Sequence, residues 1–273
     1  MNYIYIFNKV YKESYREQIP FEFKLIKKVI HHDMSTFYSF VNHNNQILGF
    51  SRSHYLSRDV RSLKLKDSFD IETLDVPLII GEDARAFIHN DSIYVTDNYC
   101  HDQHIYNSNT KERVKIDLNY KNTSYISHQN KLYGIHRMKP FELYEIDTND
   151  GKATRVSTSE GESNSEYRGG TPGYEWKPNQ YIGFGHITKN HPFLDSPTSE
   201  PMTHKVFFWM VDFNTKQPTL SIQDVEIPTS KLLLDPTSLI KKDGKVILVI
   251  CESDSIWHHD QEFSTCFYEV KGL

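Results

Sequence analysis

The chain of 273 residues has a formal net charge of −5 at pH 7, and 38% of its residues are hydrophobic. This mildly acidic composition provides no broad basic field for a phosphate backbone, so it excludes a general nucleic-acid binder. The 17 Tyr and 16 Phe residues favour strands, so mainly extended structure is expected.

The first 35 residues are expected to form a closing strand and a short helix. The apolar stretch before Lys9 covers about seven residues, which is too short for a signal segment or a membrane span. Residues 21–31, FEFKLIKKVIH, show a helical stripe, although a strand interpretation competes. The three cysteines lack paired spacing, which favours a reducing, cytoplasmic location without integral membrane segments.

Five later segments repeat one unit, in which an alternating run, a polar turn and a second alternating run predict a β-hairpin. They cover residues 37–55, 84–99, 123–138, 171–187 and 237–253. Their turns are expected at Asn44–Asn45, Asn90–Asp91, Asn130, Pro178–Asn179 and Asp243–Gly244, mostly residue types that tolerate the left-handed conformation. The turns recur about every 40 to 65 residues, which is typical of four-stranded propeller blades.

Further alternating runs at residues 141–156 and 204–222 supply candidate outer strands for two of these units. No linker rich in Gly, Pro or Ser divides the chain. The sequence therefore predicts an all-β fold, a single five-bladed β-propeller domain over residues 1–273. A β-sandwich is the alternative, since it shares the short alternating strands.

A propeller gathers the residues that begin its innermost strands at one end of a central channel. Several polar residues occupy this position or lie just beyond the hairpins. They are Arg52, Tyr55, Glu82, Asp83, Arg85, Lys121, Asn122, Arg168, Gly169, Gly170, Thr171 and Asp254. We expect them to line one channel mouth and to bind a substrate there.

Four motifs carry a family resemblance: GEDARAF from residue 81, YKNTSYI from residue 120, YRGGTPGYE with YIGFGH from residue 167, and VEIPTS with VILVICESD from residue 225. In this order they resemble the five-bladed propeller glycosidase-like superfamily, which contains β-mannoside phosphorylases and related β-mannosyltransferases. The resemblance implies that Asp83 is the catalytic acid or base, that His186 lies near the substrate, and that the reaction inverts the anomeric centre. Ala84 replaces the usual proline, and Tyr120 replaces an acidic residue.

Glycosyl transfer requires a carboxyl group that takes a proton from a hydroxyl or gives one to a leaving oxygen. Asp83 suits either task. Arg85 is expected to keep Asp83 ionised by charge pairing or to bind a phosphate, and a structural salt bridge is the plainer alternative.

The segment from Arg168 to Thr171 combines a cation with free backbone N–H groups, which suits a phosphate or a sugar oxygen, although a plain loop explains it equally well. Asp254 is a candidate second carboxylate, with Glu252 as its rival.

No metal and no cofactor are expected. Histidines cluster in HHD (31–33), HDQH (101–104) and WHHD (257–260), but none has helical His-x-x-x-His spacing or a cysteine partner set. The sequence has neither an Asp-x-Asp motif after a strand in a parallel α/β pattern nor a Gly-rich dinucleotide fingerprint. These absences argue against the common nucleotide-sugar transferase folds and favour a metal-independent mechanism.

These observations predict an inverting glycosyltransferase that moves a sugar from a nucleotide sugar or sugar phosphate to a glycan acceptor, with Asp83 as general base. One alternative is a glycoside phosphorylase or hydrolase acting on β-linked oligosaccharides. A second alternative is a non-catalytic, glycan-binding propeller.

Overall fold

The computed structural model describes residues 19–31, 36–52, 59–74, 79–99, 102–118, 122–161, 166–190, 200–254 and 263–273. All regular elements in these ranges are strands, which confirms the all-β prediction. Across the same ranges, no helix is long and apolar enough to cross a membrane.

Three antiparallel sheets follow one another along the chain. The first contains β2 (Thr36–His43), β3 (Gln46–Arg52), β4 (Asp59–Leu65) and β5 (Ile71–Thr73), with β6 (Ile79–Ile80) also paired to β4. The second contains β7 (Glu82–His89), β8 (Ser92–Tyr99), β9 (Asp102–Asn107) and β10 (Arg113–Ile116). The third contains β11 (Ser124–His128), β12 (Lys131–Arg137), β13 (Glu142–Ile146) and β14 (Ala153–Thr158).

A nine-stranded sheet holds the remaining strands and consists of two antiparallel halves. One half contains β15 (Tyr167–Arg168), β16 (Tyr174–Lys177), β17 (Gln180–Lys189), β18 (Thr203–Asp212) and β19 (Thr219–Asp224). The other contains β20 (Leu233–Lys242), β21 (Lys245–Ser253), β22 (Phe263–Lys271) and β1 (Glu22–His31). A single parallel residue pair, His204 with Leu233, joins the halves.

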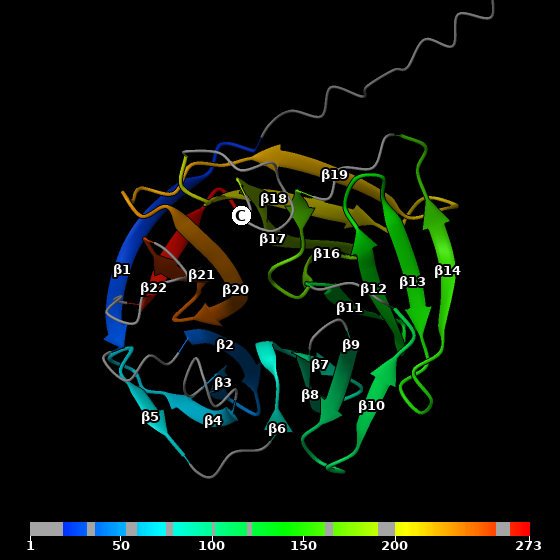
Figure 1. Cartoon of the computed structure of the whole chain (residues 1–273), viewed down its shortest axis with the longest axis horizontal. Coiled ribbons are helices and arrows are strands. Elements are labelled where there is room, and N and C mark those ends of the chain that lie inside the picture. Colours follow the sequence, from blue (N-terminus) through cyan, green and yellow to red (C-terminus); the bar gives the residue numbers. More distant parts are fainter. Residues whose placement is uncertain are drawn as a thin grey trace, which may run out of the picture.

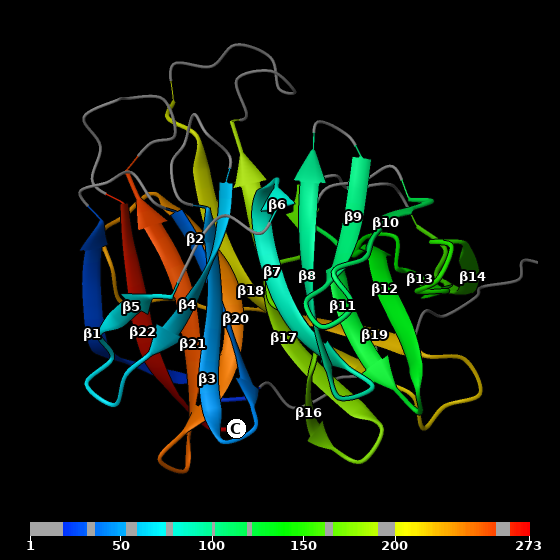
Figure 2. The same cartoon turned by 90° about the horizontal axis from the view of Figure 1, so that it is seen from below.

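The sheets stand around a common centre, with β2, β7, β11, β16 and β20 nearest to it (Figure 1). Figure 2 shows the same strands from the side, running between the two faces of the ring. This arrangement differs from the two face-to-face layers of the β-sandwich alternative.

Residues 22–31 form a strand, which confirms the competing strand interpretation of this segment and contradicts the helix. They provide β1, which pairs antiparallel with β22. Strand β22 is almost completely buried, and its backbone N–H and C=O groups need partners on both sides. The hydrogen bonds that β1 forms with β22 stabilise the strand more than the weak helical pattern of these residues favours a helix.

All five predicted hairpins form, as β2–β3, β7–β8, β11–β12, β16–β17 and β20–β21. Their turn residues share a positive φ, which explains why Asn, Asp and Gly occur there. These residues are Asn44, Asn45, Asn90, Asp91, Gln129, Asn130, Asn179, Asp243 and Gly244.

The hydrophobic core consists of clusters that lie between neighbouring sheets. Phe50 of the first sheet packs with Val95 of the second, and Phe87 of the second packs with Leu132 of the third. Further clusters connect the third sheet to β17–β18, the two halves of the large sheet to each other, and β20–β22 to the first sheet. Apolar packing therefore runs around the whole ring and leaves the polar residues of the inner strands to form a site.

Candidate active site

Asp83 lies in a β-bulge at the start of β7. Glu82 pairs with Asn98 and Arg85 pairs with Thr96, so Asp83 and Ala84 together oppose the single residue Asp97. The Ala84 side chain is fully buried, whereas Asp83 is half-buried and has a φ of 52°. A bulge commonly re-aims a side chain near a functional site, and a left-handed non-glycine residue there points to the same purpose.

Arg85 holds this bulge through the main chain. Its Nη1 donates a hydrogen bond to the Asp83 carbonyl oxygen at 2.9 Å, and its Nε donates to the Gly170 carbonyl oxygen at 3.0 Å. The guanidinium is 3% exposed and lies 5.6 Å from the centre of the Phe37 ring. The expected ion pair with the Asp83 carboxylate is therefore not what the structure shows: the two hydrogen bonds of the Arg85 side chain go to backbone carbonyl oxygens. Among the described residues, the Asp83 carboxylate contacts no hydrogen-bond or ion-pair partner.

Gly169 allows a close approach to the segment before β11 of the third sheet, and Gly170 allows a close approach to β17 of its own sheet. A Cβ atom at Gly169 would lie 2.0 Å from the Asn122 carbonyl oxygen, and one at Gly170 would lie 2.5 Å from the Phe184 carbonyl oxygen. Only glycine fits such positions.

The expected anion cradle on this segment is not supported. The Gly170 N–H donates to Ser124 Oγ at 3.2 Å, and the Thr171 N–H donates to the Phe184 carbonyl oxygen at 2.8 Å. The Thr171 hydroxyl in turn accepts the Phe184 N–H at 3.0 Å. These backbone groups serve packing between strands, so they are not available to a ligand. The Arg168 side chain is half-buried and forms no ion pair with a described residue, so its charge remains available.

His186 lies opposite Arg168 in the β15–β17 pairing and belongs to a buried polar cluster. Its Nδ1 is 3.4 Å from Asp235 Oδ1, and Nδ1 of His204 is 3.2 Å from Asp235 Oδ2. Burial lowers the pKa of His186 well below its usual range, and the nearby charges of Arg168 and Arg85 act in the same direction.

Asp235 and His204 were not among the residues expected in the site. Burial by itself raises the pKa of Asp235, but the charges of His204, His186 and Arg85 hold it below its usual range. The sequence signal was the break of the apolar run 232–234 by an acid before Pro236. The fifth hairpin was expected to begin at Thr237, whereas β20 begins at Leu233 and includes Asp235.

The structure brings most of the expected residues together around Arg85. Contacts or charge effects described above connect Asp83, Arg85, Asn122, Arg168, Gly169, Gly170, Thr171 and His186. The side-chain oxygen of Asn122 is buried without a hydrogen-bond partner, so it is an unused polar group in this region.

Other expected residues lie elsewhere or are not described. Arg52 ends β3 and is buried, and Glu82 is half-buried opposite Asn98. Asp254 is exposed and forms an ion pair with Lys231 at 2.5 Å, and no contact joins it to the group around Arg85. Tyr55 and Lys121 lie outside the described residues.

Glu252, the rival of Asp254, is a buried structural carboxylate. Its two oxygens accept hydrogen bonds from the Tyr268 hydroxyl at 2.5 Å and from the Thr229 hydroxyl at 3.1 Å. Both oxygens of Glu252 are therefore used in structural hydrogen bonds and are not available to a substrate.

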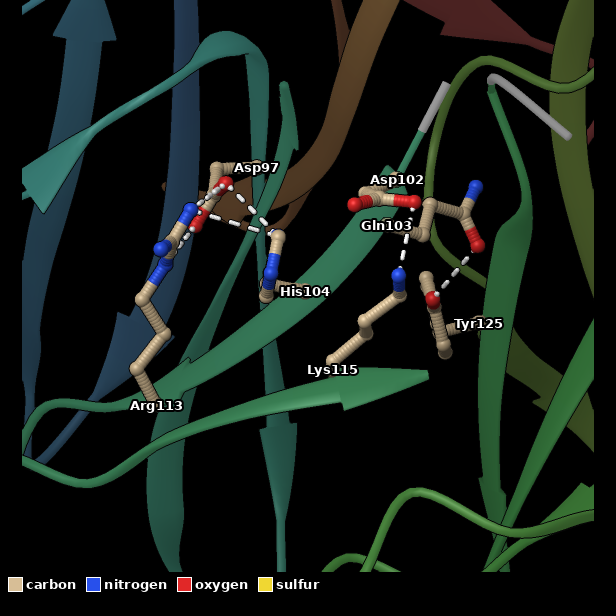
Figure 3. A network of polar contacts seen from close by, with 7 residues as sticks. All are labelled: Asp97, Asp102, Gln103, His104, Arg113, Lys115 and Tyr125. Atoms are coloured by element: carbon tan, nitrogen blue, oxygen red, sulfur yellow. Dashed lines mark hydrogen bonds and ion pairs between the residues drawn. The ribbon is translucent and has the colours of Figure 1, made fainter. Parts of the chain in front are cut away.

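A second carboxylate with protein partners, Asp97, lies directly opposite the Asp83 bulge. Figure 3 shows Asp97 beside Arg113 and His104. Arg113 donates to both oxygens of Asp97, from Nε at 3.0 Å and from Nη2 at 2.6 Å, and Nδ1 of His104 lies 3.4 Å away. A Cβ at Gly81 would lie 2.3 Å from the Asp97 Cβ, so this glycine lets the chain pass over the buried acid.

The same view shows two neighbouring polar contacts. Gln103 accepts a hydrogen bond from the Tyr125 hydroxyl at 3.1 Å, and Lys115 pairs with Asp102 at 2.9 Å (Figure 3). Burial raises the pKa of Tyr125, and the negative charge of Asp97 adds to this effect. These polar contacts hold β8, β9 and β10 together and connect β9 to β11, so we interpret them as structural.

Comparisons with known proteins give a likeness of fold. No family model matches the chain, and no curated protein matches it. A mannose phosphorylase from Leishmania mexicana, solved with a phosphate ion, is 10% identical with a TM-score of 0.59, over 89% of this chain and 88% of that one. An exo-β-1,3-galactanase from Phanerochaete chrysosporium, solved with galactose, is 9% identical with a TM-score of 0.57, over 89% and 64%.

A β-fructofuranosidase from Bombyx mori is 12% identical with a TM-score of 0.53, over 88% of this chain and 63% of that one. This chain therefore spans less than two thirds of the galactanase and of the fructofuranosidase. The family resemblance expected from the ordered motifs is confirmed at the level of the fold, which this chain shares with β-propeller enzymes of carbohydrate chemistry.

Proposed function

We propose that this chain is a single-domain, five-bladed β-propeller enzyme that acts on glycosidic bonds, and that its reaction is phosphorolysis of β-linked oligosaccharides. The blade count follows if each half of the nine-stranded sheet is one blade, since a single parallel residue pair is the only strand pairing between the halves among the described residues. Apolar clusters at the successive sheet-to-sheet boundaries support that count.

The observation that carries the proposal is the combination at the start of β7. Asp83 is a half-buried carboxyl group without a protein partner among the described residues, held at a positive φ by the buried Arg85. Arg168 adds an available positive charge to the same region. A carboxyl group and a free guanidinium are what a proton transfer to sugar and the binding of phosphate require.

In the proposed reaction, Asp83 gives its proton to the glycosidic oxygen as the bond to the anomeric carbon breaks. A phosphate oxygen attacks that carbon from the opposite face, so the products are a sugar 1-phosphate and a shortened oligosaccharide. Arg168 would bind the phosphate and stabilise its charge during the attack.

Phosphorolysis fits this site better than inverting hydrolysis. Inverting hydrolysis needs a second carboxylate to activate water, whereas phosphate is itself the nucleophile. Asp235 is buried beside two histidines, which makes it a poor base for water, and Glu82, half-buried next to Asp83, is the described acid that a hydrolytic mechanism would have to use. Hydrolysis remains the second candidate because the galactanase and the fructofuranosidase share the fold. Transfer from a nucleotide sugar, the first expectation from the sequence, receives no support from these comparisons.

The test is a panel of β-linked manno-, galacto- and xylo-oligosaccharides incubated with purified protein, with and without inorganic phosphate. We expect phosphate-dependent release of a sugar 1-phosphate, measured by anion-exchange chromatography, with mannosides first because of the motif resemblance. Release of free sugar at the same rate without phosphate would replace the phosphorylase by a hydrolase. Turnover of nucleotide sugars alone, or glycan binding without any turnover, would overturn the proposal.

A further inference from the structure

The buried cluster of His186, His204 and Asp235 joins three strands on one face of the large sheet. His204 pairs with Thr188, two residues from His186, and with Leu233, two residues from Asp235. Side chains two positions apart on a strand share a face, so the register brings all three side chains together. Their exposed fractions are 1%, 8% and 8%.

The geometry of the three side chains is that of a metal-ligand set. One ligand atom from each residue lies within 4.8 Å of the others. The imidazole Nδ1 atoms lie 3.4 and 3.2 Å from the carboxylate oxygens. Ligands bound tetrahedrally about 2.1 Å from Zn²⁺ are separated by roughly 3.4 Å, so these spacings need only small adjustments.

The hydrogen bonding of the cluster is also incomplete. The two rings are stacked with centres 4.5 Å apart, and both face the carboxylate of Asp235. Only His204 forms a hydrogen bond with Asp235, while Nδ1 of His186 is buried without a hydrogen-bond partner. A buried nitrogen without a partner costs folding free energy, so it needs an explanation. An imidazole nitrogen without a hydrogen-bond partner, 3.4 Å from a carboxylate oxygen, is a nitrogen that a metal ion would satisfy.

We propose that His186, His204 and Asp235 bind a first-row divalent transition metal, with Zn²⁺ as the best match. Two imidazoles and a carboxylate are a known ligand combination for this ion, and they leave a fourth position for another oxygen donor. Asp235 supplies one negative charge, and Arg85 lies near enough to affect its pKa. This positive neighbour weakens cation binding, so we expect a lower affinity than that of a cysteine-rich structural zinc site.

The position of the cluster suggests what the metal would do. His186 and His204 belong to one half of the nine-stranded sheet and Asp235 to the other, beside the single parallel pair that joins them. The His204 N–H also donates to the Leu232 carbonyl oxygen at 2.9 Å. A bound metal would therefore link the halves where few backbone hydrogen bonds do so, and its binding free energy would stabilise the fold.

The test measures metal binding directly on the full chain, without reference to catalysis. Protein dialysed against a chelator is titrated with Zn²⁺ by calorimetry, its metal content is determined by mass spectrometry, and its thermal midpoint is followed. Co²⁺ is the second probe, because its visible spectrum reports nitrogen and oxygen ligands in tetrahedral geometry. We expect a single equivalent of Zn²⁺ per chain and a higher midpoint on addition.

Two variants test the assignment of the ligands, and a third variant is the control. His204→Ala and Asp235→Asn should weaken Zn²⁺ binding by more than about tenfold and abolish the rise in midpoint. His43→Gln, in the distant β2–β3 hairpin, is the matched control and should bind like the wild type. Absence of stoichiometric Zn²⁺ and Co²⁺ binding by the wild-type chain would overturn the proposal even if the variants fail to fold. Unchanged binding by folded Asp235→Asn would also overturn it. Neither result depends on whether the chain is a phosphorylase.

Discussion

Two carboxylates on neighbouring strands of one sheet, Asp83 and Asp97, have opposite environments. Asp97 is completely buried, and Arg113 binds both of its oxygens. Asp83 lies in the bulge across from it, half-buried and without a partner among the described residues. A buried carboxylate with a bidentate arginine is committed to structure, whereas an unpaired carboxyl group in a strained backbone is available for chemistry. The comparison teaches that pairing and burial, not the proximity of acids in the sequence, separate the two roles.

The sharpest test of this difference removes the ionisable group of Asp83 and keeps its shape. For Asp83→Asn we expect turnover to fall by roughly 10²- to 10⁴-fold, because an amide cannot transfer the proton. Its unfolding free energy should change by less than about 0.5 kcal/mol, because the carboxylate has no partner to lose. Initial rates on the oligosaccharide identified in the phosphate-dependent screen provide the measurement. Asp91→Asn, at another positive φ in the same sheet, is the control. Retention of half the wild-type rate by Asp83→Asn would remove Asp83 from the mechanism.

The reverse experiment removes the partner of Asp97. Arg113→Ala leaves a buried carboxylate uncompensated, so we expect a loss of about 3 kcal/mol in unfolding free energy, measured by urea denaturation. The Arg113 side chain is 38% exposed, so water replaces some of what it provides and the loss should not exceed this value. Arg155→Ala, an exposed residue of β14, should change stability by less than about 0.5 kcal/mol. Equal unfolding free energies of Arg113→Ala and Arg155→Ala would show that Arg113 does not stabilise the buried Asp97 carboxylate.

Four partly buried histidines in the second and third sheets are expected to make the stability of the fold depend on pH. Burial lowers the pKa of His89, His104, His128 and His136 in the folded chain. The unfolded chain therefore binds protons first as the pH falls through about 6.5, so the folded state should lose stability below that pH and keep it above. Urea midpoints at intervals from about pH 7.5 to pH 5 give the profile. A flat profile would mean that these rings accept protons without loss of native packing.

The smallest expected effect concerns the backbone of Asp83. Asp83→Gly removes the side chain from a residue with a φ of 52°, so we expect a gain of about 0.5 kcal/mol in unfolding free energy together with loss of activity. Ala84→Gly, at the buried neighbour, should lower stability because it removes a packed methyl group. Destabilisation by both variants would show that the bulge stores no strain at Asp83.

The hairpins could be predicted from the sequence because their signals are local. Asn44–Asn45 and Asp243–Gly244 need a positive φ, and alternation on both sides of each turn identifies the paired strands. The placement of Asp83 at the start of β7 followed from the same pattern together with the motif resemblance.

The partners of the site residues could not be predicted in this way. Asp235 meets His186 and His204 only because β20 begins earlier than the pattern indicated and pairs with β18. The backbone N–H groups of Gly170 and Thr171 looked free in the sequence, but strand packing uses both. Such contacts depend on the register between distant segments, which alternation alone does not determine.

The pairing of β1 with β22 has a consequence for how the ring assembles. His31 and Thr265 are hydrogen-bonded although 234 positions separate them. Contacts of this kind form late, because a long loop must close before they contribute any free energy. During synthesis β1 therefore cannot pair until β22 has been made, and closure of the ring is expected to be a slow step of refolding.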